Sequence, residues 1–168
     1  MNNEPTFTLV DAERAREEAQ RLFEAVSTSL KAVLPPTADI RHIGATAVPG
    51  CLTKGDLDIV VRVASEDFDN ADRVLAHRFA RNEGSVCTKT FSAFEDSSSL
   101  PPLGLQLAAF DSPFDDFHQF VEALLRSPAL VQEYNELKRA HDGGDMAVYR
   151  SAKDAFIEKV LADFRSHL

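Results

Sequence analysis

The chain contains little sulfur and comparatively little positive charge. Its 168 residues include two cysteines, Cys51 and Cys87, no tryptophan, and 18 lysines and arginines against 27 aspartates and glutamates, so the formal net charge is −9. The cysteine spacing excludes a CxxC zinc motif and a disulfide framework. The acidic balance disfavours a protein that grips a long nucleic acid through its phosphates, because such proteins carry a basic surface. A small nucleotide handled through a metal ion remains compatible with this charge.

Long apolar runs are also missing. No stretch of 18 apolar residues could cross a bilayer, and the first 20 residues lack the basic and then apolar regions of a secretory signal. We therefore expect a cytoplasmic protein without a membrane partner. A chain of this length can bury a core unaided, and we expect one domain over residues 1–168.

The hydrophobic pattern predicts an α+β fold: a small mixed sheet with flanking helices and a helical C-terminal third. Strands are expected over 39–44, 56–63, 85–95 and 103–110. Helices are expected over 9–34, from Ser65 onward, and over 115–126, 128–141 and 146–167. The strand over 103–110 is expected to be central, because almost every one of its residues is apolar.

Two acidic residues begin the strand predicted over 56–63. Asp56 and Asp58 stand at alternate positions, so their side chains point to the same face and can hold one cation between them. The apolar residues that follow indicate a buried strand, where carboxylates need a positive partner. A divalent metal would serve, and Lys54 or Arg62 could serve instead.

A glycine-rich turn precedes these acids. Gly44 and Gly50 frame the segment, and such a turn can offer backbone N–H groups to an anion. It is not a Walker A loop, because Lys54 does not directly follow the second glycine. It can also be an ordinary tight connection held by Pro49. An anion site beside a cation site is what metal-dependent chemistry on a nucleoside triphosphate needs.

These segments together resemble the GrpB family, also called UPF0157. The segment from His42 to Gly50, HIGATAVPG, is similar to the family motif H-(I/V)-G-S-T-(A/S)-V-P-G. Lys54 and the strand from Asp58 resemble the K-P-x-x-D-I motif that follows. The segments YNELK and YRSAKDAFI in the C-terminal third resemble the family's Y-x-x-L-K and Y-x-x-x-K-x-x-F-I. The chain departs from the family at Ala45, where serine is usual.

The GrpB family is similar to the nucleotidyltransferase superfold related to DNA polymerase beta, and this resemblance implies a site. Gly44, Ala45 and Thr46 would meet the phosphates of a nucleoside triphosphate, with Thr46 adding a hydroxyl donor. Asp56 and Asp58 would act in catalysis and hold Mg²⁺, or Mn²⁺ in its place. The implied substrate-binding set is completed by Lys54, Lys138, Tyr149 and Lys153. The implied partners are a small nucleotide and an acceptor that the sequence does not name.

Several of these side chains also have structural interpretations. Lys138 and Lys153 are compatible with exposed positions on helices, and Tyr134 and Tyr149 could pack with Phe156 rather than stack on a base. Two further residues are expected to be structural. His42 is expected to be a hydrogen-bonded strand residue, and Cys51 a small packing residue whose nearest positive neighbour in sequence is Lys54.

One catalytic feature of that superfold is missing from its expected place. Its enzymes carry a third acid on a later strand, but the strand over 103–110 has Gln106 as its only polar side chain. A glutamine can orient a ligand but cannot take a proton from an attacking hydroxyl. Glu95 and Asp111, at strand ends, are the possible substitutes. Three functions therefore stay open: transfer of a nucleoside monophosphate, a non-catalytic nucleotide- or phosphate-binding module that kept the fold, or a structural or partner-binding protein that uses the helical C-terminal third.

Overall fold

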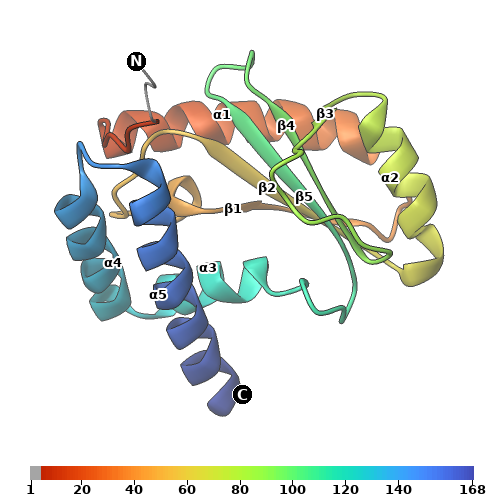
Figure 1. Cartoon of the computed structure of the whole chain (residues 1–168). Helices are drawn as coiled ribbons and strands as arrows, with labels where there is room; N and C mark the ends of the chain where they lie inside the picture. The colour runs from red at the N-terminus through yellow and green to blue at the C-terminus, as the bar shows by residue number, and fades with distance from the viewer. Residues whose placement is uncertain (1–4) are drawn as a thin grey trace.

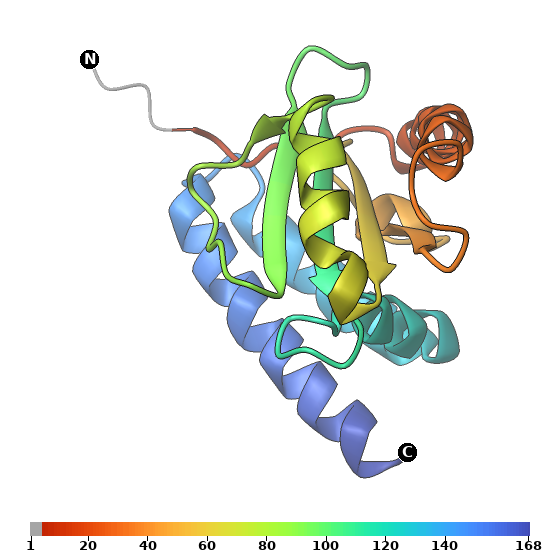
Figure 2. The ribbon, with the colours of Figure 1, turned by 90° about the vertical axis from the view of Figure 1, so that its right-hand side faces the viewer.

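The computed structural model describes residues 5–168 and places a five-stranded mixed sheet between two layers of helices (Figures 1 and 2). The strands are β1 (Asp39–Ile43), β2 (Leu57–Val63), β3 (Ala80–Arg81), β4 (Phe91–Asp96) and β5 (Leu103–Ala109). Their order is β1-β2-β5-β4-β3; β2 and β5 are parallel and the other neighbours antiparallel. The helices are α1 (Ala12–Lys31), α2 (Phe68–Ala76), α3 (Phe117–Arg126), α4 (Pro128–His141) and α5 (Met146–Ser166), with 3₁₀ turns η1 (Ala45–Ala47) and η2 (Ser65–Asp67). This is the expected α+β class.

Helices α1 and α2 cover one face of the sheet. Strand side chains alternate between faces, so Leu57, Ile59, Val61 and Val63 of β2 all point to this layer and are buried. Matching leucines of β5 extend the same core. Asp11 caps α1 by accepting from the Arg14 N–H at 2.9 Å.

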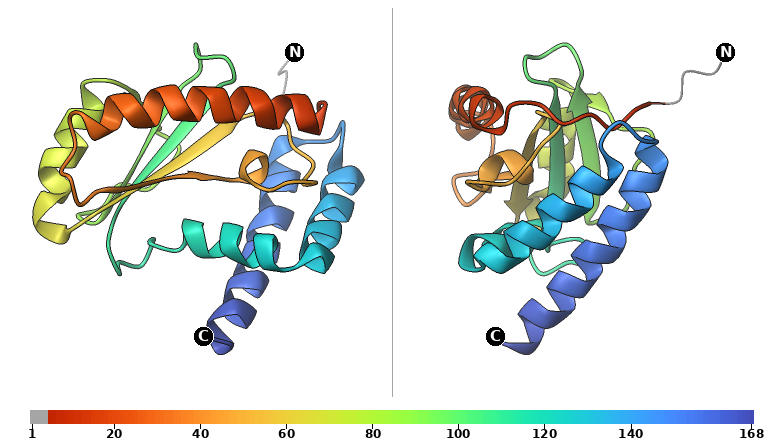
Figure 3. Two further views of the ribbon diagram at one scale, coloured as in Figure 1. Left: turned by 180° about the vertical axis from the view of Figure 1, so that it is seen from behind. Right: turned by 90° about the vertical axis from the view of Figure 1, so that its left-hand side faces the viewer.

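Helices α3, α4 and α5 form the second layer, on the opposite face (Figure 3). Val60 of β2 packs there against Phe120 and Leu124 of α3 and Leu161 of α5. Because Asp58 lies two residues before Val60, it points into this same layer. The predicted acids therefore lie between the sheet and the C-terminal helices.

The structure adds the short strand β3, which was not predicted, and shortens the helix predicted over 9–34 to α1. Further differences concern β2, β4 and the segment after Ser65. The strand over 56–63 begins at Leu57, so Asp56 lies in the preceding loop. The strand over 85–95 is shorter, Phe91–Asp96, because Cys87, Thr88 and Lys89 are exposed and pair with no strand. The helix after Ser65 starts as a 3₁₀ turn without a side-chain cap. No helix within residues 5–168 has the length and hydropathy to span a membrane.

An extended N-terminal strap, Pro5–Val10, crosses the start of α5 (Figure 3). Thr6 forms an isolated antiparallel bridge with Asp145. The Phe7 N–H donates to the Gly144 carbonyl at 2.9 Å. The strap thus joins the beginning of the described chain to the α4–α5 connection.

Candidate functional site

Two glycines enclose the carboxylate of Asp58. In the sheet, Asp58 pairs with Ile43 of β1 on one side and with Gly104 of β5 on the other. A Cβ atom placed on Gly44 would lie 2.8 Å from Asp58 Oδ2, and one placed on Gly104 would lie 2.7 Å from Oδ1. Gly44 also has a φ of 76°, which side chains disfavour. Only glycine at both positions leaves room for this carboxylate.

Three lysines and a second acid surround Asp58. Asp56 forms an ion pair with Lys54, and Lys153 of α5 is the cation that acts most strongly on Asp58. Burial raises the pKa of Asp58 and Asp56 adds to this, while Lys153, Lys54 and Lys138 oppose it. Three ammonium groups against two carboxylates leave one positive charge in excess. The cluster therefore favours an anion.

Lys138 is buried rather than exposed. It has 1% of its surface accessible, and its Nζ donates to the Leu52 carbonyl and lies 3.4 Å from Cys51 Sγ. The same Nζ is 3.8 Å from the Tyr134 ring centroid. Burial lowers the Lys138 pKa to about 8. The exposed-helix interpretation is wrong for this lysine, and Cys51 has a cationic neighbour that lies 87 residues away in sequence.

The cluster borders two hollows. The lysine hollow, about 40 Å³, is lined by Asp56 and Asp58, all three lysines, and apolar or aromatic side chains that include Phe7. The ring cavity, about 170 Å³, lies between the sheet and helices α3 and α5 and is lined by Asp58, Gln106 and mostly apolar residues. Asp58, Tyr134 and Lys153 line both hollows. The two spaces therefore meet at these three side chains.

Phe7 of the strap closes the lysine hollow. Its ring is 1% exposed and stacks on Tyr149, with centroids 3.7 Å apart and planes at 11°. Tyr134 stacks on Phe156 with ring centroids 5.2 Å apart, so the interpretation of Tyr134 as a packing residue is confirmed. Tyr149 packs on the strap instead, and burial raises its pKa to about 12. Both tyrosines thus contribute aromatic walls to the cluster.

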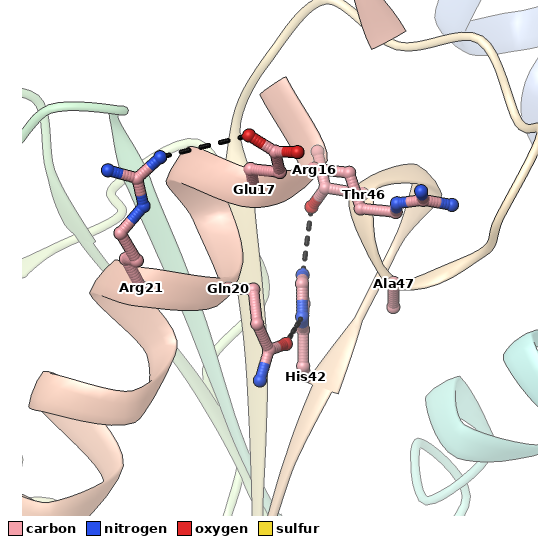
Figure 4. A pocket seen from close by; sticks show the side chains of 7 residues that line it. All are labelled: Arg16, Glu17, Gln20, Arg21, His42, Thr46 and Ala47. Carbon is pink, nitrogen blue, oxygen red and sulfur yellow. Dashed lines mark hydrogen bonds and ion pairs between the residues drawn. The ribbon is translucent and has the colours of Figure 1, made fainter. Parts of the chain in front are cut away.

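The turn after β1 presents its backbone and its threonine to opposite sides. Thr46 is buried in a groove against α1, and its hydroxyl is within donating distance of the Asp56 carbonyl, at 3.1 Å. The same hydroxyl lies 2.9 Å from His42 Nε2, and His42 Nδ1 lies 3.1 Å from Gln20 Oε1 (Figure 4), so the hydroxyl hydrogen goes either to the Asp56 carbonyl or to Nε2. Burial lowers the His42 pKa to about 4, so the ring is neutral. His42 is structural, as expected.

The Thr46 geometry corrects one expectation. Its hydroxyl hydrogen goes to the Asp56 carbonyl or to His42 Nε2, so it is not offered to a phosphate. Ala45, by contrast, lines the lysine hollow. The first N–H groups of a helical turn have no partner within that turn, and η1 begins directly after Gly44. Backbone groups of this turn are thus the donors left for an anion.

The sheet register places one of the two candidate substitutes for the missing third acid on the face of Asp58. Gly104 pairs with Asp58 on one side and with Glu95 of β4 on the other. Partners across a sheet share a face, so Glu95 points to the same side as Asp58, about 10 Å away by strand spacing, with no side chain between them. Asp111 follows the far end of β5, more than about 16 Å along the strand from Gly104. Of the two substitutes, Glu95 is therefore the nearer to Asp58, but it is exposed and lines neither hollow.

A metal would need ligands from outside the chain. Within residues 5–168, no group of three or more histidine, cysteine, aspartate or glutamate side chains is arranged to hold one. Asp56 and Asp58 nevertheless line one hollow, and a pair of carboxylates completed by substrate phosphates is a usual donor set for Mg²⁺. Asp56 would exchange its ion pair with Lys54 for the metal.

The family model described as GrpB protein matches residues 10–163. The chain belongs to the GrpB family. A UPF0157 protein of Vibrio cholerae is 35% identical to this GrpB chain over 151 residues, which is 89% of this chain and 79% of that protein. The crystal structure of GrpB from Enterococcus faecalis has a TM-score of 0.67 at 22% identity, covering 87% of this chain and 92% of the other. The resemblance noted in the sequence is confirmed.

The fold is also similar to that of Cid1, a protein with RNA terminal uridylyl transferase activity. The TM-score is 0.54 at 12% identity, covering 77% of this GrpB chain and 40% of the Cid1 chain. Likeness at this identity concerns the fold, and it supports the predicted nucleotidyltransferase type of sheet.

The structure therefore brings most of the predicted site residues of this GrpB protein together. Asp56, Asp58, Lys54, Lys138, Lys153, Tyr149 and Ala45 line the lysine hollow, Gly44 lines the ring cavity, and Thr46 points elsewhere. The sequence analysis missed Gly104 and Phe7. A glycine inside an otherwise apolar strand signals close approach of another group, so Gly104 could have been found.

Proposed function

We propose that this GrpB protein binds a Mg²⁺–nucleoside triphosphate and transfers its nucleoside monophosphate to an acceptor. The observation that carries this proposal is the Asp58 carboxylate, fixed between Gly44 and Gly104 beside Asp56 and within an excess of lysines. Fixed carboxylates suit a hard cation, and the lysines suit the phosphates that accompany it.

Each part of the cluster has a role in this proposal. The phosphates meet the backbone N–H groups that follow Gly44, with Lys153 and Lys54 as charge partners. Asp56 and Asp58 would hold Mg²⁺, which would supply neutralisation of the negative charge on the leaving pyrophosphate. The acceptor hydroxyl oxygen bonds to the α-phosphorus as the bond to the bridging oxygen breaks, and its proton passes to a carboxylate. Glu95 is the carboxylate for this role.

The partners follow from the charge of the molecule. A formal net charge of −9 suits a small substrate that arrives with its own cation better than a long nucleic acid. We propose a free nucleotide as substrate, a small-molecule acceptor, and neither a long nucleic acid nor a membrane as partner.

One observation favours a second function, that of a nucleotide-binding module without turnover. Strand β5 carries Gly104 and Gln106 on the face shared with Asp58, and neither can accept a proton from an acceptor. If Glu95 does not act as base, binding would persist without transfer. Pyrophosphate release separates the two functions: the module binds triphosphate and releases none with any acceptor.

The binding half is tested by calorimetry with the four ribonucleoside triphosphates in the presence and absence of Mg²⁺. We expect Asp58→Asn to abolish the Mg²⁺-dependent binding while the circular dichroism spectrum stays native. Asp163→Asn, on the exposed side of α5, is the matched control and should bind like the parent protein. Unchanged binding by Asp58→Asn would overturn the metal assignment.

A second variant tests the enclosure itself. Gly104→Ala leaves every charge in place. It introduces a methyl carbon that would lie 2.7 Å from Asp58 Oδ1, which is too close. We expect triphosphate affinity to fall at least tenfold, because the carboxylate must rotate out of position. Gly84→Ala, in an exposed loop with its nearest atom at 3.5 Å, is the control and should have no effect.

A further inference from the structure

The ring cavity has the size and walls of a site for one flat ring. Its volume is about 170 Å³, and Phe117 and Phe120 of α3 face Ile157 and Leu161 of α5 across it. An apolar protein cavity of roughly 150 Å³ holds one benzene molecule, whereas sites for drug-sized ligands start at about 300 Å³. Aromatic walls also favour a planar ligand, because bases stack on them. The space thus suits a single six-membered ring.

One polar group in this cavity lacks a partner. The Oε1 atom of Gln106 is buried and makes no hydrogen bond within residues 5–168. A buried acceptor without a donor is costly, so the cavity favours a ligand that brings an N–H or O–H group. The Gln106 amide also has a donor nitrogen, and together the two atoms match an edge with a donor beside an acceptor. Uracil and cytosine both present such an edge.

The ring cavity lies next to the lysine hollow, where the phosphates of the nucleotide are proposed to bind. Asp58, Tyr134 and Lys153 separate the ring cavity from the lysine hollow and line both. A ligand that fills both spaces has a ring at one end and negative charge at the other. A nucleotide has this form.

We propose that the ring cavity binds the base of a pyrimidine nucleotide and that Gln106 hydrogen-bonds the donor–acceptor edge of this base. The proposal rests on the proposed function for its phosphates, and it adds the class of base. A purine has a second fused ring, for which the cavity is small, and an aliphatic group would leave the Gln106 oxygen unpaired. We therefore expect the size of the cavity to exclude purines and the Gln106 amide to favour a polar ring over an aliphatic group.

Nucleosides test the base site without phosphates or metal. We expect uridine and cytidine to bind at least tenfold more tightly than adenosine and guanosine in NMR titrations, with shifts on α3 and α5. Gln106→Leu keeps the side-chain size and should lower pyrimidine affinity about tenfold. Gln132→Leu, on the exposed surface of α4, is the matched control and should leave it unchanged.

A second variant keeps the test decisive if Gln106→Leu does not fold. Ile157→Phe adds volume to the cavity wall and should abolish nucleoside binding while triphosphate binding through the lysine hollow becomes weaker and loses base preference. The proposal is overturned if purine nucleosides bind as tightly as pyrimidines, if no nucleoside binds at millimolar concentration, or if Gln106→Leu binds like the parent.

The base site and the proposed function can fail separately. Asp56→Asn, at a residue that lines the lysine hollow but not the ring cavity, should weaken Mg²⁺-dependent triphosphate binding but keep uridine binding. Pyrimidine selectivity with no triphosphate binding would support the base site and refute the metal–phosphate assignment. Triphosphate binding with no selectivity among the four bases would support the metal–phosphate assignment and refute the base site.

Discussion

At the scale of single residues, Lys138 holds an ammonium group where charge is costly. The side chain is almost fully buried, and burial lowers its pKa from 10.5 to about 8. The Leu52 carbonyl and the Tyr134 ring are its compensating neighbours. A lysine kept under these conditions beside Asp58 favours a functional role for the site over a purely structural one.

The shifted pKa of Lys138 has a consequence for stability. Below pH 8 the lysine binds a proton in both folded and unfolded chains, so the burial penalty is fully present. Between pH 8 and 10.5 the unfolded chain binds more protons, and the free energy of unfolding rises with pH. From pH 8 to 9 we expect the contribution of Lys138 to increase by about 1 kcal/mol.

Urea unfolding at pH 7, 8 and 9 checks this expectation. The free energy of unfolding of Lys138→Met should not rise in this way, so its difference from the parent value should change with pH. Lys89→Met, in an exposed loop, is the control and should follow the parent at every pH. Above pH 9 the buried Cys51 thiol works in the opposite direction, because burial raises its pKa. Parallel pH profiles for parent and Lys138→Met would mean that the lysine titrates normally.

At the scale of elements, three paired strands bring Asp58, Gly104 and Glu95 into one row. The glycine in the middle removes the side chain that would otherwise separate the two acids. If Glu95 accepts the acceptor proton, Glu95→Gln should lower the turnover rate at least a hundredfold, within the range for loss of a general base, and leave KM for the triphosphate unchanged.

Pyrophosphate release during a screen of acceptors measures this effect. Glu83→Gln, in the exposed loop before β4, is the matched control and should retain full activity. A fall in triphosphate binding for Glu95→Gln would instead indicate that the carboxylate helps to hold the substrate rather than to move a proton.

Local patterns in the sequence were sufficient for the elements and for part of the site. Helical periodicity predicted α4 with its observed bounds. The spacing of Asp56 and Asp58 predicted that both would point to one face of a strand; Asp56 instead precedes β2, although both acids line one hollow. Contacts between distant segments were not predictable in this way. The burial of Lys138 depends on a loop 87 residues away, and the Gly104 enclosure depends on strand register.

At the scale of the whole molecule, the N-terminal strap joins the beginning of the described chain to the α4–α5 connection beside the lysine hollow. The hollow beneath Phe7 measures about 40 Å³, little more than the roughly 30 Å³ that one water occupies in the liquid. The proposed triphosphate would therefore need the strap or the neighbouring side chains to move before its phosphates could enter. The hydrogen bonds of the strap to the α4–α5 connection oppose this movement.

A disulfide across the strap tests whether this movement is needed. Thr6 and Asp145 form an antiparallel pair, whose Cα separation of about 4.5–5.5 Å suits a disulfide. We expect Thr6→Cys with Asp145→Cys, in a Cys87→Ser background, to bind triphosphate at least tenfold more weakly when oxidised. Reduction of the same sample is the control and should restore binding. Equal affinity in both states would mean that the ligand enters beneath a closed strap.

The strap also gives the affinity of the site a second component. If the proposed nucleotide enters only when Phe7 is displaced from Tyr149, the observed dissociation constant equals the intrinsic one divided by the fraction of molecules with Phe7 displaced. Anything that holds Pro5–Val10 away from α5 would tighten nucleotide binding without touching a single ligand-binding atom. A mutation in this strap would then change how often the site is available, and the chemistry within it would stay the same.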